Sequence, residues 1–560
     1  MNLLCSSYRL PHFLLCAALL SLNAFAQAPN NPKVDAIFAA YDKPDVPGCA
    51  LGVIKDGQLI YARGYGMANL EHGIPNGPKL VYDIGSTSKQ FAAASILLLQ
   101  QQGKLSLSDD IRKFVPEMHA SPQTVTIRHL IHHTSGLRDY LTLFSLAGVN
   151  FDDTTTENDA LQLIARQREL NFPPGEQWLY SNSGYFLLSI IVKRASGKSL
   201  AEFAREHIFT PLGMKDTLIL DNHKRIIPRR ATGYSPGRNG FQTEMSNFEQ
   251  TGDGAVQTSI EDLLRWDQNF YDPKVGGPEF LKQMQEVGSL NNGEKLSYAS
   301  GLFIGEYKGL RMVSHGGSWA GYRAELARFP EQKLSVACLC NSAATNPTLL
   351  AQRVAEVYLA DQLKTPPTSA ATANKPTAIS LTEAQLQDKV GLYRSASSGE
   401  LLRISLRDGK LRFDPFTPNN FELSPVSADR FLVVAPGQIN ELIFDTSQPQ
   451  QKRLTVKRTG LGTDVLEAVP SATLTPEQLK AYVGSYYSEE LDTTYLVNIE
   501  NGQLAISHTS GLKWLVLPTF PDGFTTSSGM RFNFTRDAQK RVLSFAVQAG
   551  RTRNLRFAKQ

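Results

Sequence analysis

One apolar stretch constrains the fold of this chain more than any other feature. Residues 86–102 begin with Ser-Thr-Ser-Lys and continue through a run rich in alanine and leucine. Their apolar side chains fall on every face of a helix, which is typical of a helix buried on all sides. Gly103 follows where a glycine commonly ends a helix. We therefore expect a central, buried helix over 86–102.

The first turn of this helix carries a hydroxyl and an amine. Ser86 and Lys89 are three residues apart and so share one helical face. A helix N-terminus favours negative charge, and burial can lower a lysine pKa by several units from about 10.4. The pair predicts nucleophilic catalysis with a lysine base. Ser-x-x-Lys is a weak signal alone, and its recurrence at Ser510 to Lys513 is interpreted as chance.

Length and composition set the broad class. A chain of 560 residues is expected to hold two to four domains. Hydrophobic residues make up 42% and charged residues 20%, as in globular proteins. The net charge of +4 is small and its charges are scattered, which argues against a nucleic-acid partner. No segment after the N-terminus is long and apolar enough to predict a transmembrane helix.

The N-terminus predicts export. Arg9, a short apolar run and Ala24-Phe25-Ala26 form the pattern of a signal peptide over 1–26, so we expect a secreted or periplasmic protein. Three cysteines would remain after cleavage: Cys49, Cys338 and Cys340. The last two share one face of a strand and are poor partners for each other, so we expect no disulfide framework.

The order of the elements predicts an α+β domain over 27–364. Residues 49–69 indicate a hairpin with an Asp-Gly turn, and several helices follow. Four strands after residue 298 and a helix over 349–362 end this part, so the sheet is completed by distant strands. The helices are expected over 86–102, 106–114, 125–133, 157–170, 184–197, 199–209 and 259–271. Residues 365–380 are rich in proline, threonine and alanine and indicate a linker.

An internal repeat follows the linker. Residues 381–393 match residues 474–486, and the register continues to Phe431 against Phe524. Short alternating segments between turns predict two all-β units, over 381–468 and 469–560. Each has the length of a small closed barrel.

Two later segments offer partners for Ser86. Tyr180-Ser181-Asn182 lies in a loop that enters a helix, and His315 begins a His-Gly-Gly-Ser strand segment. The glycines allow close backbone approach, as an oxyanion hole requires.

The three motifs, Ser-x-x-Lys at 86–89, Tyr-x-Asn at 180–182 and His-x-Gly at 315–317, follow one another in this order. Together they resemble the serine β-lactamase and penicillin-binding protein family, and in particular its class C-like branch. Supporting segments are 130–137, 173–176, 211–214 and 315–322, and the resemblance covers roughly residues 32–360. It implies a β-lactamase/transpeptidase-like fold. With two β-barrels appended, the layout most resembles the D-aminopeptidases of this family.

The resemblance also implies a role for each residue. Ser86 would be the acylating nucleophile, and Lys89 would take its proton. Tyr180 would relay a proton to the leaving group, and Asn182 would orient the lysine and the substrate amide. His315 would hold the far end of the substrate or tune the Tyr180–Lys89 pair. Gly317 and Ser318 would form the oxyanion-hole segment, in which the backbone N–H of Ser318 would act with that of Ser86. No cofactor or metal is implied.

One motif departs from the family pattern. Lys-Thr-Gly is replaced by His-Gly-Gly, and histidine is only partly charged at neutral pH. A fixed ammonium suits the carboxylate of β-lactams and of peptides ending in D-Ala-D-Ala. We therefore predict a peptidase, amidase or esterase rather than a strong β-lactamase. The alternative is a receptor that β-lactams or peptidoglycan acylate with little turnover, and cell-wall material is a candidate partner of the β repeats.

Other candidate residues receive structural interpretations. His129, His132 and His133 have helical spacing, but no intervening glutamate or third ligand indicates a metal site. Asp253 is interpreted as part of a helix start. Arg323 follows the His315 turn, where lining the pocket and a plain strand role are both open.

Overall fold

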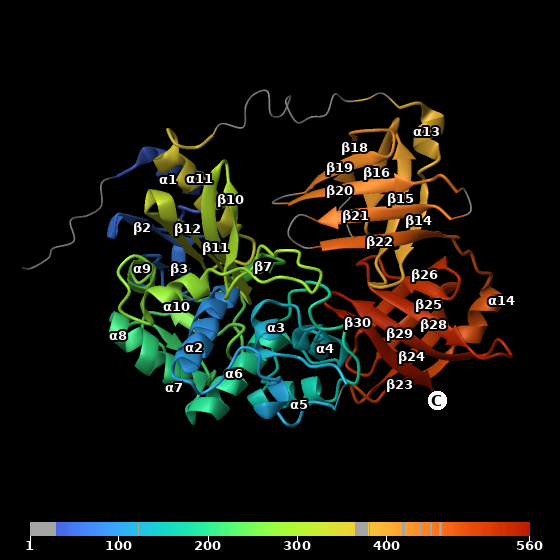
Figure 1. The fold of residues 1–560 in the computed structure, drawn as a ribbon, viewed down its shortest axis with the longest axis horizontal. Helices are drawn as coiled ribbons and strands as arrows, with labels where there is room; N and C mark the ends of the chain where they lie inside the picture. The colour runs from blue at the N-terminus through green and yellow to red at the C-terminus, as the bar shows by residue number, and fades with distance from the viewer. Residues whose placement is uncertain are drawn as a thin grey trace, which may run out of the picture.

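The computed structural model describes residues 30–120, 122–364, 379, 381–416, 421–435, 438–448, 451–458 and 462–560 (Figure 1). The predicted signal peptide, 1–26, lies outside the described residues, as does the predicted linker, 365–380, apart from residue 379. None of the described helices is both long and apolar enough to cross a membrane.

A six-stranded antiparallel sheet forms the base of the first part. The predicted hairpin is present as β1 and β2, and Asp56 and Gly57 both take the positive φ that such a tight turn needs. Strand β13 pairs with β1, so distant strands complete the sheet. The spatial order is β10 (Phe303–Tyr307), β11 (Leu310–Trp319), β12 (Tyr322–Phe329), β13 (Leu334–Cys340), β1 (Cys49–Lys55) and β2 (Gln58–Tyr65).

Helices cover both faces of this sheet (Figure 1). On one face, α1 (Pro32–Phe38) and α11 (Pro347–Leu359) pack on β1 and β13 around a separate apolar core. The other face holds the main core and the helical region. That region contains α2 (Lys89–Gln101), α3 (Ile127–Ile131), α4 (Tyr140–Leu146), α5 (Glu157–Ala165), α6 (Asn182–Ser196), α7 (Leu200–Ala204), α8 (Thr210–Leu212), α9 (Ile260–Gln268) and α10 (Gly277–Met284).

The central helix is the predicted one. Every residue from Lys89 to Leu99 is buried, and a 3₁₀ turn, Gly85–Ser88, precedes α2 and carries Ser86. Gly103 has φ +69°, the left-handed conformation expected after a helix end.

The predicted helix over 106–114 is wrong. Only a 3₁₀ turn, Ile111–Lys113, forms there. The Asp109 carboxylate accepts a hydrogen bond from the Ser106 N–H, and the Asp110 side chain caps the turn. These short polar side chains hold the backbone in turns instead of a helix. The other predicted helices form, most of them shorter than expected.

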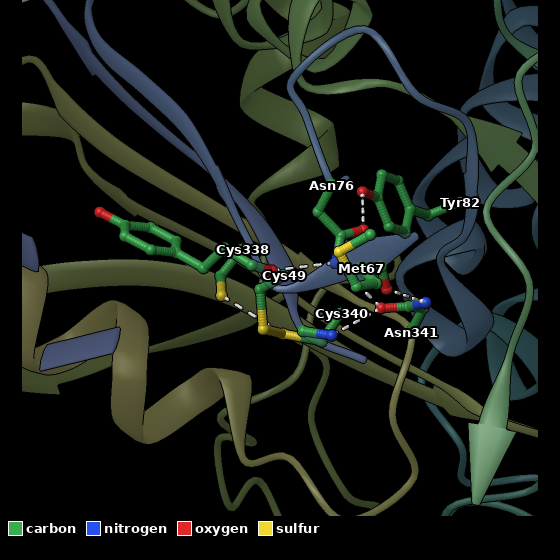
Figure 2. Close-up of a disulfide and its surroundings, with 9 residues drawn as sticks. Cys49, Met67, Asn76, Tyr82, Cys338, Cys340 and Asn341 are labelled. Carbon is green, nitrogen blue, oxygen red and sulfur yellow. Dashed lines mark hydrogen bonds between the residues drawn. A yellow bond between two sulfur atoms is a disulfide. The ribbon is translucent and has the colours of Figure 1, made fainter. Parts of the chain in front are cut away.

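A disulfide, which we did not expect, joins the first and last sheet strands in sequence. Cys49 on β1 lies directly opposite Cys340 on β13 and is bonded to it, 291 positions away in the chain (Figure 2). Cys338 stays a buried free thiol 3.6 Å from the sulfur of Cys340. The expectation failed because it considered only the pair on one strand, whereas the partner is on the neighbouring strand.

Two all-β units follow. The first is a nine-stranded sheet in the order β17 (Phe421–Glu422), β16 (Lys410–Asp414), β15 (Leu401–Arg407), β14 (Gly391–Ser395), β22 (Gly462–Val469), β21 (Arg453–Arg458), β20 (Gln438–Asp445), β19 (Arg430–Ala435) and β18 (Ser424–Pro425). The second is a closed barrel of β23 (Gly484–Ser488), β24 (Thr493–Glu500), β25 (Gln503–His508), β26 (Lys513–Phe520), β27 (Gly523–Thr525), β28 (Arg531–Arg536), β29 (Val542–Ala549) and β30 (Thr552–Lys559).

The repeat is visible at the start of both units. Short helices α13 (Glu383–Gln387) and α14 (Pro476–Leu479) each begin with a threonine–glutamine capping box. After each, a buried tyrosine hydroxyl donates to the carbonyl four residues earlier: Tyr393 to Lys389 at 2.9 Å, and Tyr486 to Tyr482 at 2.7 Å. The α+β fold followed by barrel-like β units is therefore confirmed, and the exact domain boundaries stay predictions.

The closed barrel of the second β unit (the second barrel) is joined to the helical region (Figure 1). Its apolar core is continuous with the main core of the first part, whereas the first β unit has a core of its own. A buried ion pair joins Arg138 to Glu490 at 2.6 Å, and Arg138 also donates to the carbonyls of Arg553 and Asn554. These contacts fix the β29–β30 turn beside the start of α4.

Candidate active site

Ser86 and Lys89 meet at the start of α2. The Lys89 Nζ donates to Ser86 Oγ at 3.0 Å, to Asn182 Oδ1 at 2.9 Å and to the Asp253 carbonyl at 2.6 Å. Lys89 is fully buried, and burial lowers its pKa to about 7. A lysine in this state can accept the proton of the serine at neutral pH.

Tyr180 lies beside this pair. Lys89 Nζ is 4.9 Å from the centroid of its ring. The Tyr180 hydroxyl is buried and makes no hydrogen bond to any described residue. Burial raises the pKa of Tyr180, and Ser86 and Arg551 act in the opposite direction. The phenol is thus a protonated group beside Ser86.

The loop that presents Tyr180 is held by the 130–137 segment. The carbonyl of His133 accepts the Leu179 N–H, and His133 Nδ1 accepts the Ser181 N–H at 3.1 Å. The His133 ring also stacks against Tyr180, with centroids 4.2 Å apart. Asn182 then begins α6, and its N–H donates to the Asp139 carboxylate at 2.8 Å. His133 therefore positions the tyrosine.

The other two histidines of the group have separate contacts. His129 Nδ1 accepts the Thr126 N–H in a capping box at the start of α3, while burial lowers the pKa of His132 to about 3. Among the described residues, the set of side chains close enough to share a metal ion is the three cysteines, two of which form the disulfide.

Strand β11 closes the opposite side of the site. Thr87 Oγ1 donates to the His315 carbonyl at 3.0 Å, which ties β11 to the turn that carries Ser86. A Cβ at Gly317 would lie 1.8 Å from the Ile84 carbonyl oxygen, and a Cβ at Gly85 would lie 2.7 Å from the Ser318 nitrogen. Only glycine allows this approach, which brings the Ser318 backbone beside the Ser86 turn.

The surroundings of His315 favour an uncharged imidazole. Its Nε2 is 3.0 Å from the Tyr298 hydroxyl, and its Nδ1 is 2.6 Å from the Gly316 carbonyl. Burial, with the nearby Lys89, lowers the pKa of His315 to about 3. The residue is therefore a neutral imidazole at physiological pH and provides no fixed cation on this wall of the cleft.

Two residues of the site were not predicted as such from the sequence. Asp253 was interpreted as part of a helix start. Its backbone carbonyl accepts a hydrogen bond from Lys89, and its carboxylate accepts one from the Tyr140 hydroxyl at 3.0 Å. Its second carboxylate oxygen is buried without a partner among the described residues. Burial raises the Asp253 pKa, whereas Lys89 lowers it. The Thr-Gly-Asp-Gly sequence around it was the available signal.

The second is Arg551, from the β29–β30 turn of the second barrel. Its guanidinium carbon lies 4.6 Å from the centroid of the Tyr180 ring. Its backbone carbonyl accepts the side-chain amide of Asn171 at 2.9 Å. No local motif marks this arginine in the sequence, because only the docking of the barrel brings it to Tyr180.

These residues line one cleft of about 970 Å³. It contains Ser86, Tyr180, Asn182, His315, Gly317 and Ser318, together with Asp253, Arg323 and Arg551. Lys89 lies beneath its floor. Phe151 stacks on Phe248, Trp319 packs against both rings, and the three form an aromatic wall. The cleft thus brings a serine hydroxyl, a buried lysine amine and close backbone N–H groups beside a partly aromatic surface.

The beta-lactamase family model matches residues 34–359, more than half of the chain. The chain belongs to the beta-lactamase family. This confirms the resemblance on which the sequence-based roles depend.

Relatives in the beta-lactamase family include penicillin-binding proteins and D-aminopeptidases. A penicillin-binding protein of Bacillus subtilis (strain 168) is 31% identical over 303 residues, which cover 51% of this chain and 66% of that protein. A D-aminopeptidase of Gluconobacter oxydans (strain 621H) is 30% identical over 66% of this chain and 67% of its own length. The matches thus span about two thirds of these relatives.

A solved structure shares the fold over a longer part of the chain. The penicillin-binding protein homologue from Pyrococcus abyssi has a TM-score of 0.54 and 24% identity, over 78% of this chain and 99% of that one. This likeness supports the beta-lactamase-type fold with its β extension.

Proposed function

We propose that this protein is a serine hydrolase that acts through an acyl-enzyme on the amides and esters of short peptides and D-amino acids. The observation that carries the proposal is the buried Lys89 amine, 3.0 Å from Ser86 Oγ, with a pKa lowered to about 7. A nucleophile and a base in contact inside a cleft are the minimum for covalent acyl transfer. The D-aminopeptidase relative supports the substrate class.

The steps follow from the placement of each group. Ser86 Oγ attacks the substrate carbonyl carbon while Lys89 takes its proton. The oxyanion that forms is held by the N–H groups of Ser86 and Ser318. The bond to the leaving nitrogen or oxygen then breaks, and Tyr180 supplies the proton that the leaving group needs.

Deacylation completes the cycle. Water attacks the acyl-Ser86 carbonyl, and Tyr180 with Lys89 accepts its proton. The acid is released and Ser86 Oγ recovers a proton. Asn182 holds Lys89 in place through the 2.9 Å contact during both halves.

The test uses matched substrates and one substitution. Wild-type protein should hydrolyse D-aminoacyl p-nitroanilides or p-nitrophenyl esters, and a fluorophosphonate should label Ser86. Ser86→Ala should abolish both turnover and labelling while keeping the thermal unfolding midpoint. Full activity in this variant would overturn the assignment. L-aminoacyl p-nitroanilides, measured in parallel, give the chirality preference.

The receptor alternative predicts different kinetics. The penicillin-binding relative gives it support. A burst of nitrocefin or ester acylation with no steady state would favour a receptor over a hydrolase. The uncharged His315 argues against tight binding of a β-lactam carboxylate on the β11 side.

We also propose that the protein works outside the cytoplasm. The disulfide between Cys49 and Cys340 supports this, because such bonds persist mainly in oxidising compartments. Fractionation of cells that express the full chain would test it: recovery of the protein with cytoplasmic markers would contradict the proposal. Binding of the β repeats to cell-wall material stays a prediction.

A further inference from the structure

The second barrel places a cation in the cleft beside Tyr180. Arg551 is the first residue after Gly550, which turns the chain from β29 to β30 with φ +51°. Its guanidinium stacks over the Tyr180 ring at 4.6 Å and lines the cleft. Tyr180 is the proposed proton donor to the leaving group, so Arg551 lies on that side of the scissile bond.

The backbone of this turn is fixed, whereas the guanidinium is not. The Arg551 carbonyl accepts from Asn171 Nδ2 at 2.9 Å, and the next strand residues are held by Arg138. The Arg551 side chain is 44% exposed and donates no hydrogen bond to any described residue. A guanidinium has five N–H donors, so this one is available for a ligand.

The carboxylate that pairs with Arg551 is too far away to form a hydrogen bond with it. Asp139 Oδ2 lies 3.8 Å from its Nη1, which is too long for a hydrogen bond. Asp139 is instead engaged by the Asn182 N–H at 2.8 Å and the Thr142 N–H at 3.2 Å. The ion pair therefore orients Arg551 toward the cleft and leaves its hydrogen-bonding capacity unused.

The other arginines of the cleft differ. Arg323 Nη1 donates to the carbonyls of Ala320 and Tyr322, at 2.8 and 2.7 Å. Arg230 lies over the Tyr322 ring, with its carbon 6.0 Å from the centroid. His315 is neutral and so offers no positive charge on the β11 side. Among the arginines of the described cleft, Arg551 is the one whose guanidinium forms no hydrogen bond and lies over Tyr180.

We propose that Arg551 binds the α-carboxylate of the substrate's leaving residue, so that the enzyme prefers short peptides with a free C-terminus over their C-terminal amides. This rests on the proposed hydrolase function of the same cleft. In a peptide, the α-carboxylate carbon is two bonds from the amine nitrogen that Tyr180 protonates, which matches a cation stacked on that ring. Guanidinium and carboxylate also form strong charge-assisted pairs.

Kinetics of a matched substrate pair test the proposal. D-Alanyl-D-alanine and its C-terminal amide differ only in the group that Arg551 would bind. In Arg551→Gln, kcat/KM for the free acid should fall about 10- to 100-fold, as expected for the loss of a charged hydrogen bond. The amide and a p-nitrophenyl ester lack this carboxylate, so their kcat/KM should fall less than that of the free acid, and the acid-to-amide ratio of kcat/KM should drop. Arg551→Lys should recover part of the loss.

A surface arginine on the strand that follows Arg551 provides the control. Arg556 on β30 is 67% exposed and pairs with Glu169, away from the cleft lining. Arg556→Gln should leave both substrates unaffected. Equal loss on acid and amide in Arg551→Gln would overturn the proposal and indicate that the guanidinium merely supports Tyr180.

A binding measurement separates this proposal from the proposed chemistry. In Ser86→Ala, calorimetry should show the free dipeptide binding about 10- to 100-fold more tightly than its amide. In Ser86→Ala/Arg551→Gln, the two should bind alike. Equal affinity in the first variant, or binding of neither peptide, would overturn the carboxylate site. Failure of turnover with this difference intact would instead count against the hydrolase function.

Discussion

The side-chain nitrogen of Lys89 lies 3.0 Å from the hydroxyl oxygen of Ser86 and has no exposure to solvent. The two residues are one helical turn apart, but their chemistry depends on distant residues. Asn182 and Asp253 hold the lysine from other parts of the chain, and burial supplies the change in its pKa.

The activity should rise with pH through neutrality. Below a pKa of about 7, Lys89 is protonated and cannot accept the proton of Ser86; above it, the amine is free. With a neutral p-nitrophenyl ester, kcat/KM should increase from pH 5.5 to a plateau above about pH 8. Spontaneous hydrolysis, measured with Ser86→Ala, is subtracted at each pH. A flat profile over this range would exclude a buried lysine base.

Replacing Asp253 should move that profile. Its carboxylate is the charge that most favours protonated Lys89, so Asp253→Asn should lower the midpoint by about one pH unit. Below neutral pH the variant should then lose less of its own maximal rate than the wild type. Asp262→Asn, a buried aspartate at the start of α9, is a control without contact to Lys89. An unchanged midpoint in Asp253→Asn would show that Asp253 acts only through its backbone carbonyl.

Gly317 should tolerate no side chain. A Cβ there would meet the Ile84 carbonyl oxygen at 1.8 Å, and backbone must move to admit it. Because this displaces the Ser318 N–H from the Ser86 turn, Gly317→Ala should reduce kcat about 100-fold or more. Gly305→Ala on β10 is the matched control, since its Cβ would meet nothing within 4 Å. Comparable activity in both variants would rule out an oxyanion hole formed at Ser318.

Removing the disulfide should destabilise the fold and spare the chemistry. The bond closes a loop of nearly 300 residues, and disulfides typically contribute about 2–4 kcal/mol. Cys49→Ala should lower the free energy of unfolding by about that amount, and a reductant should reproduce the loss in wild type but not in the variant. Cys338→Ala controls for the loss of a buried sulfur. Thiol labelling of denatured, unreduced protein that finds Cys49 free would contradict the bond.

Local sequence patterns predicted much of this molecule. The all-round apolar run over 86–102, the Asp56-Gly57 turn and the alternation after residue 298 each depend on neighbours in sequence, and each formed as expected. The helix over 106–114 failed because the side chains of Asp109 and Asp110 competed for the backbone.

The other parts that were missed depend on contacts between distant segments. Cys49 finds Cys340 because β1 and β13 are adjacent in the sheet, which their separate patterns do not specify. Asp253 reaches Lys89 through a loop with no regular period. Arg551 is brought to Tyr180 by the docking of a whole barrel.

That docking has a consequence for protein engineering. The Arg138–Glu490 pair and the shared core dock the second barrel so that Arg551 lines the cleft, which makes the barrel part of the active-site architecture. Chimeras that exchange only this barrel between relatives would retain the nucleophile and its base while receiving a different group beside the departing half of the substrate. Selectivity and chemical competence would then be inherited from different parents.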